Sequence, residues 1–211
     1  MKSNKANSVL NLIFLIVCSM QLTAQEKPNI LIIMSDEMSA ESMSFNLGNK
    51  FINTPNIDQL AKTGVVFSNA YCANPLCVPS RSSIFTGRYP HEMGIQNNEE
   101  KKVDPKIFPS LGSIFKNAGY ETGYVGKWHL PYDRKEPNTH GFDYLPNKTG
   151  NGHDSTSPNL ADDFIKTKRD NPFLLVVSFM NPHNICQWAR GEKLPDGAIG
   201  NPPPADQCPP L

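Results

Sequence analysis

The sequence has no excess charge of either sign and no internal repeat. Its 211 residues carry 20 Lys or Arg side chains and 20 Asp or Glu side chains. Proteins that bind nucleic acid or anionic membranes through charge present a clear excess of positive side chains. The composition therefore gives no reason to expect either partner. The length is sufficient for one good-sized domain with a hydrophobic core.

The sequence has no apolar run long enough to span a membrane comfortably, which takes about 20 residues. A basic start and an apolar run over residues 9–17 instead predict a signal peptide over residues 1–24, with cleavage after Ala24. Residues 25–211 would then be exported, to the periplasm or the cell exterior. Lipid anchoring at Cys18 is the less favoured alternative, because Val17 is a poor residue immediately before such a cysteine.

Cysteine is scarce. Beyond the signal peptide only Cys72, Cys77, Cys186 and Cys208 remain. Cys72 and Cys77 have no second close Cys or His pair to complete a zinc site, which excludes zinc binding through sulfur. An oxidising compartment would permit a disulfide involving Cys72, Cys186 or Cys208, and the sequence does not determine which cysteines pair.

One segment combines a thiol, a helix start and a cation. Pro79 suits a first helical turn, residues 80–86 read as a helix, and Gly87 supplies its end. Cys77 is therefore predicted at a helix N-terminus, where unpaired N–H groups favour an anion. Arg81 lies one helical turn further on and can point back to the same place.

The rest of the chain alternates strands with helices, as in an α/β fold. The run at 29–34 is continuously apolar, which predicts a strand covered on both faces. Further strands are predicted at 65–71, 120–125 and 173–179, and further helices at 54–64, 110–118 and 160–168.

Polar clusters follow three of these strands, at the sheet edge where open α/β sheets bind ligands. Asp36 and Glu37 follow the first strand, and adjacent carboxylates suit a hard divalent cation. Lys127 and His129 follow the third, two residues apart, so an extended backbone would place them on one face. His183 follows the fourth.

Two stretches resemble the signatures of one family. Cys77-Val78-Pro79-Ser80-Arg81, followed by Thr86-Gly87, closely resembles the signature of the type I sulfatases, and residues 119–129 resemble the second signature of that family. The resemblance spans residues 28–183. It implies the alkaline-phosphatase-like α/β fold, with a central mixed, mostly parallel sheet flanked by helices.

The resemblance also implies roles for individual residues. A formylglycine-generating enzyme would convert Cys77 to formylglycine, whose hydrate attacks sulfur. Arg81 and Lys127 would neutralise charge on the sulfate. His129 would hold a formylglycine hydroxyl, and His183 would contact sulfate and protonate the leaving group.

The metal site that the resemblance implies binds Ca2+ or Mg2+ through Asp36, Glu37 and the modified Cys77. Glu37 stands where the family usually has a second Asp. Its extra methylene moves the carboxylate, so direct ligation by Glu37 is the less secure part of this set.

The implied substrate is a sulfate ester, including that of a sulfated carbohydrate. Two alternatives are a phosphoesterase or phosphotransferase of the same superfamily, and a secreted non-catalytic protein that binds sulfated glycans. The phosphoryl enzymes use Thr or Ser as nucleophile, so Cys77 argues against the first. Hydrolysis of an aryl sulfate would exclude the second.

Family members are much longer than this chain. They carry, in their later part, a second metal-binding pair, a further sulfate-binding Lys and a small C-terminal domain. Residues 25–211 are therefore predicted to form the N-terminal part of a sulfatase catalytic domain. By itself this part is expected to be inactive and to expose an open sheet edge and apolar surface.

Overall fold

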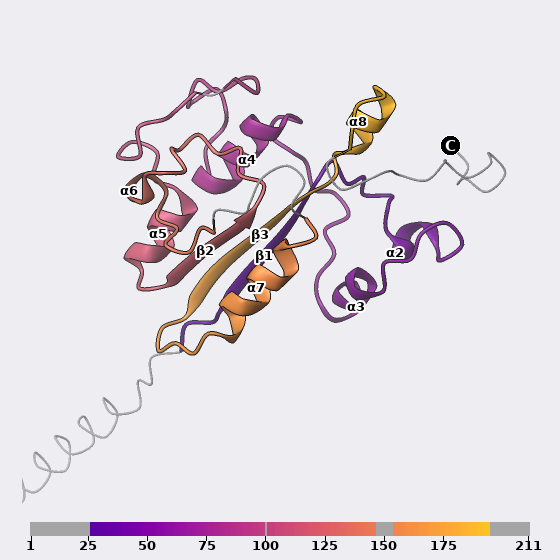
Figure 1. Ribbon diagram of the computed structural model, residues 1–211, viewed down its shortest axis with the longest axis horizontal. Helices are drawn as coiled ribbons and strands as arrows, with labels where there is room; N and C mark the ends of the chain where they lie inside the picture. Colours follow the sequence, from indigo (N-terminus) through magenta and orange to yellow (C-terminus); the bar gives the residue numbers. More distant parts are fainter. Residues whose placement is uncertain (1–25, 100, 147–153, 195–211) are drawn as a thin grey trace, which may run out of the picture.

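The computed structural model describes residues 26–99, 101–146 and 154–194. Its centre is a parallel three-stranded sheet in the order β1 (Ile30–Asp36), β3 (Phe173–Pro182), β2 (Glu121–Gly126) (Figure 1). A parallel sheet with helices between its strands confirms the predicted α/β class. The predicted signal peptide and Cys208 lie outside the described residues.

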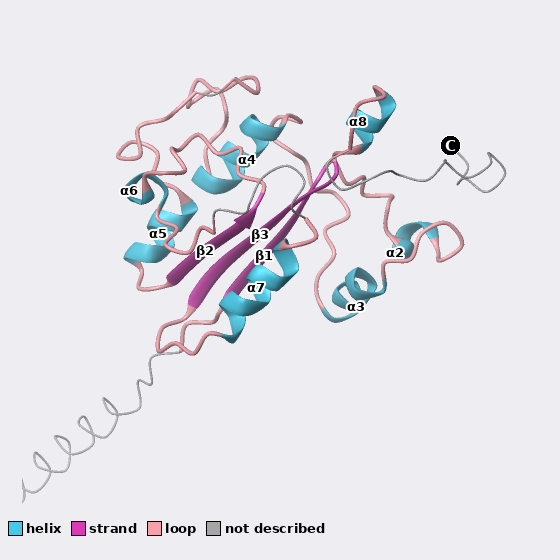
Figure 2. Cartoon of the chain, in the orientation of Figure 1, coloured by secondary structure: helices cyan, strands magenta, loops and turns pink. Residues whose placement is uncertain are grey.

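Helices cover both faces of the sheet, as Figure 2 shows. Side chains of α4 and α5 pack on one face, and those of α7 pack on the other. Successive side chains of β3 point to opposite faces of the sheet. Leu174 and Val176 join the first core, on the side of α4 and α5, and Leu175 and Val177 join the second core, on the side of α7. The helices are α2 (Ser44–Leu47), α3 (Pro55–Thr63), α4 (Cys77–Thr86), α5 (Leu111–Asn117), α6 (Pro137–His140), α7 (Ser157–Lys166) and α8 (Ile185–Ala189). None of the helices in the described ranges has the length and apolar character needed to cross a membrane.

The thiol-bearing helix starts earlier than its predicted first residue, Ser80. Leu76 is extended, with φ −126° and ψ 149°, and Cys77 is already the first residue of α4. Gly87 ends the helix as predicted, in the left-handed conformation at φ 67° that glycine adopts without strain. The placement of Cys77 at a helix N-terminus is confirmed.

Strand β1 is covered on one face only. Ile30, Ile32 and Met34 pack against the first core, whereas Leu31 is 45% and Ile33 59% exposed. The prediction that both faces are covered is wrong for the described residues, because α7 packs on β2 and β3 and does not extend over β1. The outer edge of β1 pairs with no other described strand.

The strand predicted at residues 65–71 does not form. This segment is irregular, and Val65, Phe67 and Tyr71 are 80%, 79% and 91% exposed. β-propensity stabilises a strand only when its backbone has a neighbour to pair with. The described part of the chain supplies none here, which is why the sequence-based prediction is wrong.

Candidate active site

The carboxyl ends of β1 and β3 and the N-terminus of α4 surround a cleft of about 520 Å³. Its lining includes five of the seven residues predicted for the site, which are Asp36, Glu37, Cys77, Arg81 and His183. Asn98 is one of the lining residues that were not predicted.

A buried carboxylate lies at the centre of the predicted residues. Asp36 forms an ion pair with the ammonium of Lys127, and its Oδ2 is 3.6 Å from Nη2 of Arg81. All three side chains are withdrawn from solvent, with Lys127 only 1% exposed. Buried charges are tolerated when they are paired, so each of these three holds the others in place.

Arg81 is held by groups of the sheet as well as by Asp36. Its Nη1 donates to Oγ of Ser178 at 2.8 Å, to the Lys127 carbonyl at 3.1 Å and to the Tyr124 hydroxyl at 3.3 Å. Burial raises the pKa of Tyr124, and the positive charge of Arg81 opposes that rise. Sequence reasoning missed Ser178 and Tyr124, because each reads as an ordinary polar position in a strand.

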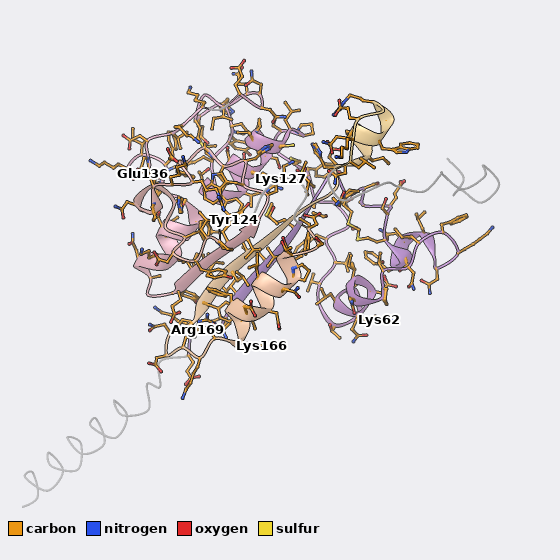
Figure 3. The ribbon with its side chains drawn as sticks, viewed as in Figure 1. Lys62, Tyr124, Lys127, Glu136, Lys166 and Arg169 are labelled. Carbon is orange, nitrogen blue, oxygen red and sulfur yellow. The ribbon has the colours of Figure 1, made fainter. Side chains whose placement is uncertain are left out.

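Lys127 enters the site because β2 ends at Gly126. Gly126 has φ 99°, and a Cβ at this position would overlap the Ser178 carbonyl. The Lys127 N–H donates to that same carbonyl at 2.8 Å. Figure 3 shows Tyr124 beside β2 and Lys127 beyond the end of that strand. The ammonium of Lys127 lies 3.6 Å from Sγ of Cys77.

Cys77 is therefore bracketed by charge. Its Sγ is 3.9 Å from Oδ1 of Asp36 on one side and faces Lys127 on another. It also begins a helix of 10 residues, whose N-terminal N–H groups add positive potential. Cys72, Cys77 and Cys186 are all free thiols in the described part of the chain.

Glu37 and His183 form a second pair on the β1 and β3 side. Nε2 of His183 is 3.8 Å from Oε1 of Glu37. Oε2 of Glu37 accepts a hydrogen bond from the Cys186 thiol at 3.1 Å, and this bond raises the pKa of that thiol. Glu37 itself adopts a left-handed backbone at φ 63°.

His129 is exposed and does not line the cleft. It has φ 42°, so the segment after β2 is not extended and the expectation that Lys127 and His129 share one face of a strand is wrong. Lys127 turns inward, and His129 stays exposed. Desolvation and, secondarily, the charge of Lys127 lower the pKa of His129, so its imidazole is biased toward the neutral form.

The donor atoms partly suit a divalent cation. Atoms of Asp36, Cys77 and His183 lie within 4.8 Å of one another. The buried carboxylate of Asp36 fits a hard cation, whereas Glu37 is engaged with His183 and Cys186. Ca2+ takes about six to eight oxygen ligands. The described residues therefore supply part of such a site.

Comparisons with known proteins agree with this arrangement. The sequence model of the family described as Sulfatase matches residues 28–205. A delta 4,5-hexuronate-2-O-sulfatase of Bacteroides thetaiotaomicron is 34% identical over 182 residues. That alignment covers 82% of this chain and 38% of the relative.

Solved structures show the same fold. A structure described as a putative sulfatase from Bacteroides thetaiotaomicron matches with a TM-score of 0.66 at 29% identity, covering 84% of this chain and 40% of that one. BT4656, solved with its substrate D-glucosamine-2-N,6-O-disulfate, matches with a TM-score of 0.62 at 27% identity, covering 75% and 35%. The chain thus spans about two fifths of the length of these proteins.

Proposed function

This chain belongs to the sulfatase family, within the alkaline-phosphatase-like superfamily, and on that premise we propose that it carries the nucleophile side of a site that hydrolyses a sulfate ester. The observation that carries the proposal is the convergence of Asp36, Arg81 and Lys127 around Cys77.

The two cations match the charge of the substrate. A sulfuryl group presents several negative oxygens, and negative charge shifts among them as the ester bond breaks. Arg81 and Lys127 are held in fixed positions by buried partners, so little reorganisation is needed when a sulfuryl oxygen arrives. The N-terminus of α4 adds N–H groups to the same field.

Cys77 is the proposed target of a formylglycine-generating enzyme. The hydrate of formylglycine would supply one hydroxyl to attack sulfur and a second to release sulfate. Lys127, 3.6 Å from the present thiol, is placed to orient the group at residue 77. The exposed His129 is proposed to hold one of the hydroxyls of this hydrate.

Asp36, with Glu37 and residue 77, is proposed to take part in holding Ca2+ or Mg2+. Such a cation would polarise an oxygen on sulfur. His183 is proposed to contact sulfate and to give a proton to the departing alcohol. Histidine titrates near neutral pH, which suits that role.

The proposed substrate class is a sulfated carbohydrate. One relative is named as a hexuronate 2-O-sulfatase, and BT4656 was solved with a disulfated glucosamine. Both support a sugar sulfate as the substrate. We further propose that the protein is exported, on the basis of the sequence at residues 1–24.

Conversion of Cys77 can be tested directly. The protein is expressed with a formylglycine-generating enzyme, and the peptide that contains residue 77 is analysed by mass spectrometry. Formylglycine is expected at residue 77 in the wild type and in Cys186→Ala, whose changed thiol lies outside the recognition segment. Cysteine that stays wholly unmodified, while a control sulfatase is converted, would refute this part.

Activity is tested on 4-nitrophenyl sulfate with Ca2+ present, using the full product of the gene. Turnover is expected from the converted wild type and none from Cys77→Ala. The 211 residues alone are expected to show negligible turnover, because their described carboxylates do not complete a Ca2+ site. Substantial turnover by the 211-residue chain would show that this reasoning about the metal is wrong.

A further inference from the structure

Asn98 reaches the site from the loop that follows α4. It lines the same cleft as Cys77. Its Oδ1 accepts a hydrogen bond from the backbone N–H of Val78 at 3.0 Å. Val78 directly follows Cys77 in the first turn of α4. A polar side chain distant from either sequence signature is thereby fixed next to the proposed nucleophile.

The chemistry of the amide settles which of its atoms meets the start of α4. The N–H of Val78 can only donate, so the atom that it meets must be the carbonyl oxygen of Asn98. The Nδ2 group, with two N–H donors, is then the free end, and it has no hydrogen-bond partner among the described residues. Nδ2 lies on the same small planar group as Oδ1, so it is close to the start of α4.

The loop that carries Asn98 is anchored. Met93 and Ile95 are buried together with Val78 in a third hydrophobic cluster, against which Val103 and Phe108 also pack. The backbone N–H of Ile95 donates to the Pro90 carbonyl at 2.9 Å. Packing therefore holds the loop as far as Ile95, and the hydrogen bond to Val78 holds the exposed side chain of Asn98.

We propose that Nδ2 of Asn98 donates a hydrogen bond to an oxygen of the sulfuryl group bound beside residue 77. This inference rests on the proposed function. Arg81 lines the cleft, and the buried Lys127 lies beside Cys77, each held by its partners at the sheet. Asn98 adds a neutral donor from the loop. A donor fixed before the substrate arrives stabilises developing charge without reorganisation.

A purely structural role makes different predictions. If Asn98 only satisfies the Val78 N–H, Asn98→Asp should be harmless, because a carboxylate accepts the same hydrogen bond and is favoured near a helix N-terminus. If Asn98 donates to sulfate, Asn98→Asp removes both donors and places a negative charge beside the sulfuryl oxygens. The structural role thus predicts unchanged activity in Asn98→Asp, whereas the donor role predicts a loss of activity without a loss of stability.

The test uses the full product of the gene after conversion of residue 77. The kcat/KM for 4-nitrophenyl sulfate, the affinity for inorganic sulfate by calorimetry, and Tm are measured for the wild type, Asn98→Asp and Asn98→Ala. Asn97→Asp is the matched control, because it makes the same change one residue away, outside the cleft lining, and its Oδ1 accepts the Glu99 N–H at 3.0 Å.

Asn98→Ala is expected to lower kcat/KM by about a hundredfold, in line with the loss of one preorganised donor, and to weaken sulfate binding. Asn98→Asp should lower both further, because it also adds a negative charge, and should leave Tm unchanged. Asn97→Asp should stay within about twofold of the wild type. If Asn98→Asp folds poorly, sulfate binding by Asn98→Ala decides the matter.

Activity and sulfate affinity that stay within about twofold of the wild type in Asn98→Asp would overturn the inference and leave Asn98 as a helix cap. Failure of the proposed function looks different, since the wild type would then hydrolyse no sulfate ester. Sulfate binding by the wild type that Asn98→Asp weakens would still support the inference in that case. A wild type that binds no sulfate would overturn both.

Discussion

Strands β1 and β3 have the same kind of sequence and different surroundings. Both are continuous apolar runs, and they are paired, with Ile30 opposite Leu174 and Ile33 opposite Val177. Residues 174–177 of β3 are almost fully buried, whereas β1 alternates between packed and exposed positions. The comparison shows that a continuous apolar run indicates a strand suited to burial on both faces. Neighbouring elements decide whether both faces are in fact covered.

The site lies where these two environments meet. Arg81 and Lys127 are anchored to the packed side, through Ser178 of β3 and the end of β2. Asp36 belongs to β1, which is covered on one face only, and it is the one buried residue of that strand. The ion pairs of Asp36 therefore connect the edge strand to the packed part of the sheet.

The largest expected effect comes from removing this connection. Asp36→Asn should lower the free energy of unfolding by about 3–5 kcal/mol, because it leaves the buried Lys127 and Arg81 without their counter-charge. Glu37→Gln, one residue further on and exposed, should change it by less than about 1 kcal/mol. Urea unfolding in EDTA measures both.

Variants at the same two positions separate the roles of Asp36 and Glu37 in activity. In the converted full product of the gene, Asp36→Ala should nearly abolish turnover of 4-nitrophenyl sulfate, and Glu37→Gln should reduce it less. Equal losses in the two variants would show that Glu37 acts as directly as Asp36.

Truncation of the apolar strands tests the comparison of β1 with β3. Leu175→Ala should destabilise the protein by about 2–5 kcal/mol, because it opens a cavity in the second core. Ile33→Ala should cost less than about 1 kcal/mol in the 211-residue chain, where that side chain is largely exposed.

Repeating the Ile33→Ala measurement in the full product of the gene sharpens this result. A loss that rises toward that of Leu175→Ala would show that the outer face of β1 is covered there. A large loss already in the 211-residue chain would contradict the exposure of Ile33.

The smallest effect is a dependence of stability on pH that arises on the packed side. His140 is fully buried beside Trp128 and Phe142, and desolvation lowers its pKa below the ordinary value of 6.5. Between pH 6.5 and the lowered pKa of the folded protein, the unfolded chain binds a proton that the folded protein does not yet take up. The free energy of unfolding should therefore fall with decreasing pH, by at most about 1.4 kcal/mol per unit for this group.

Urea unfolding at several pH values measures this slope, and NMR titration of the His140 ring assigns it. His91→Gln is the control, because His91 is exposed and its loss should leave the slope unchanged. A ring of His140 that titrates at or above 6.5 in the folded protein would contradict the expectation.

Local patterns determined a large part of this protein. Pro79 and Gly87 marked the helix that begins at Cys77, and the apolar runs located β1 and β3 to within a few residues. The residues that follow those strands supplied the members of the site. Such features depend on neighbours within a few positions along the chain, so they can be read without the fold.

Tertiary structure decided what depends on distant segments. Residues 65–71 have strand-forming side chains and no strand to pair with. Ser178 orients Arg81 across a separation of 97 residues, and Asn98 meets the N–H of Val78 from a loop that reads only as polar surface. Hydrogen bonds and burial arise between groups that meet in space, and short-range sequence patterns do not specify which distant groups will meet.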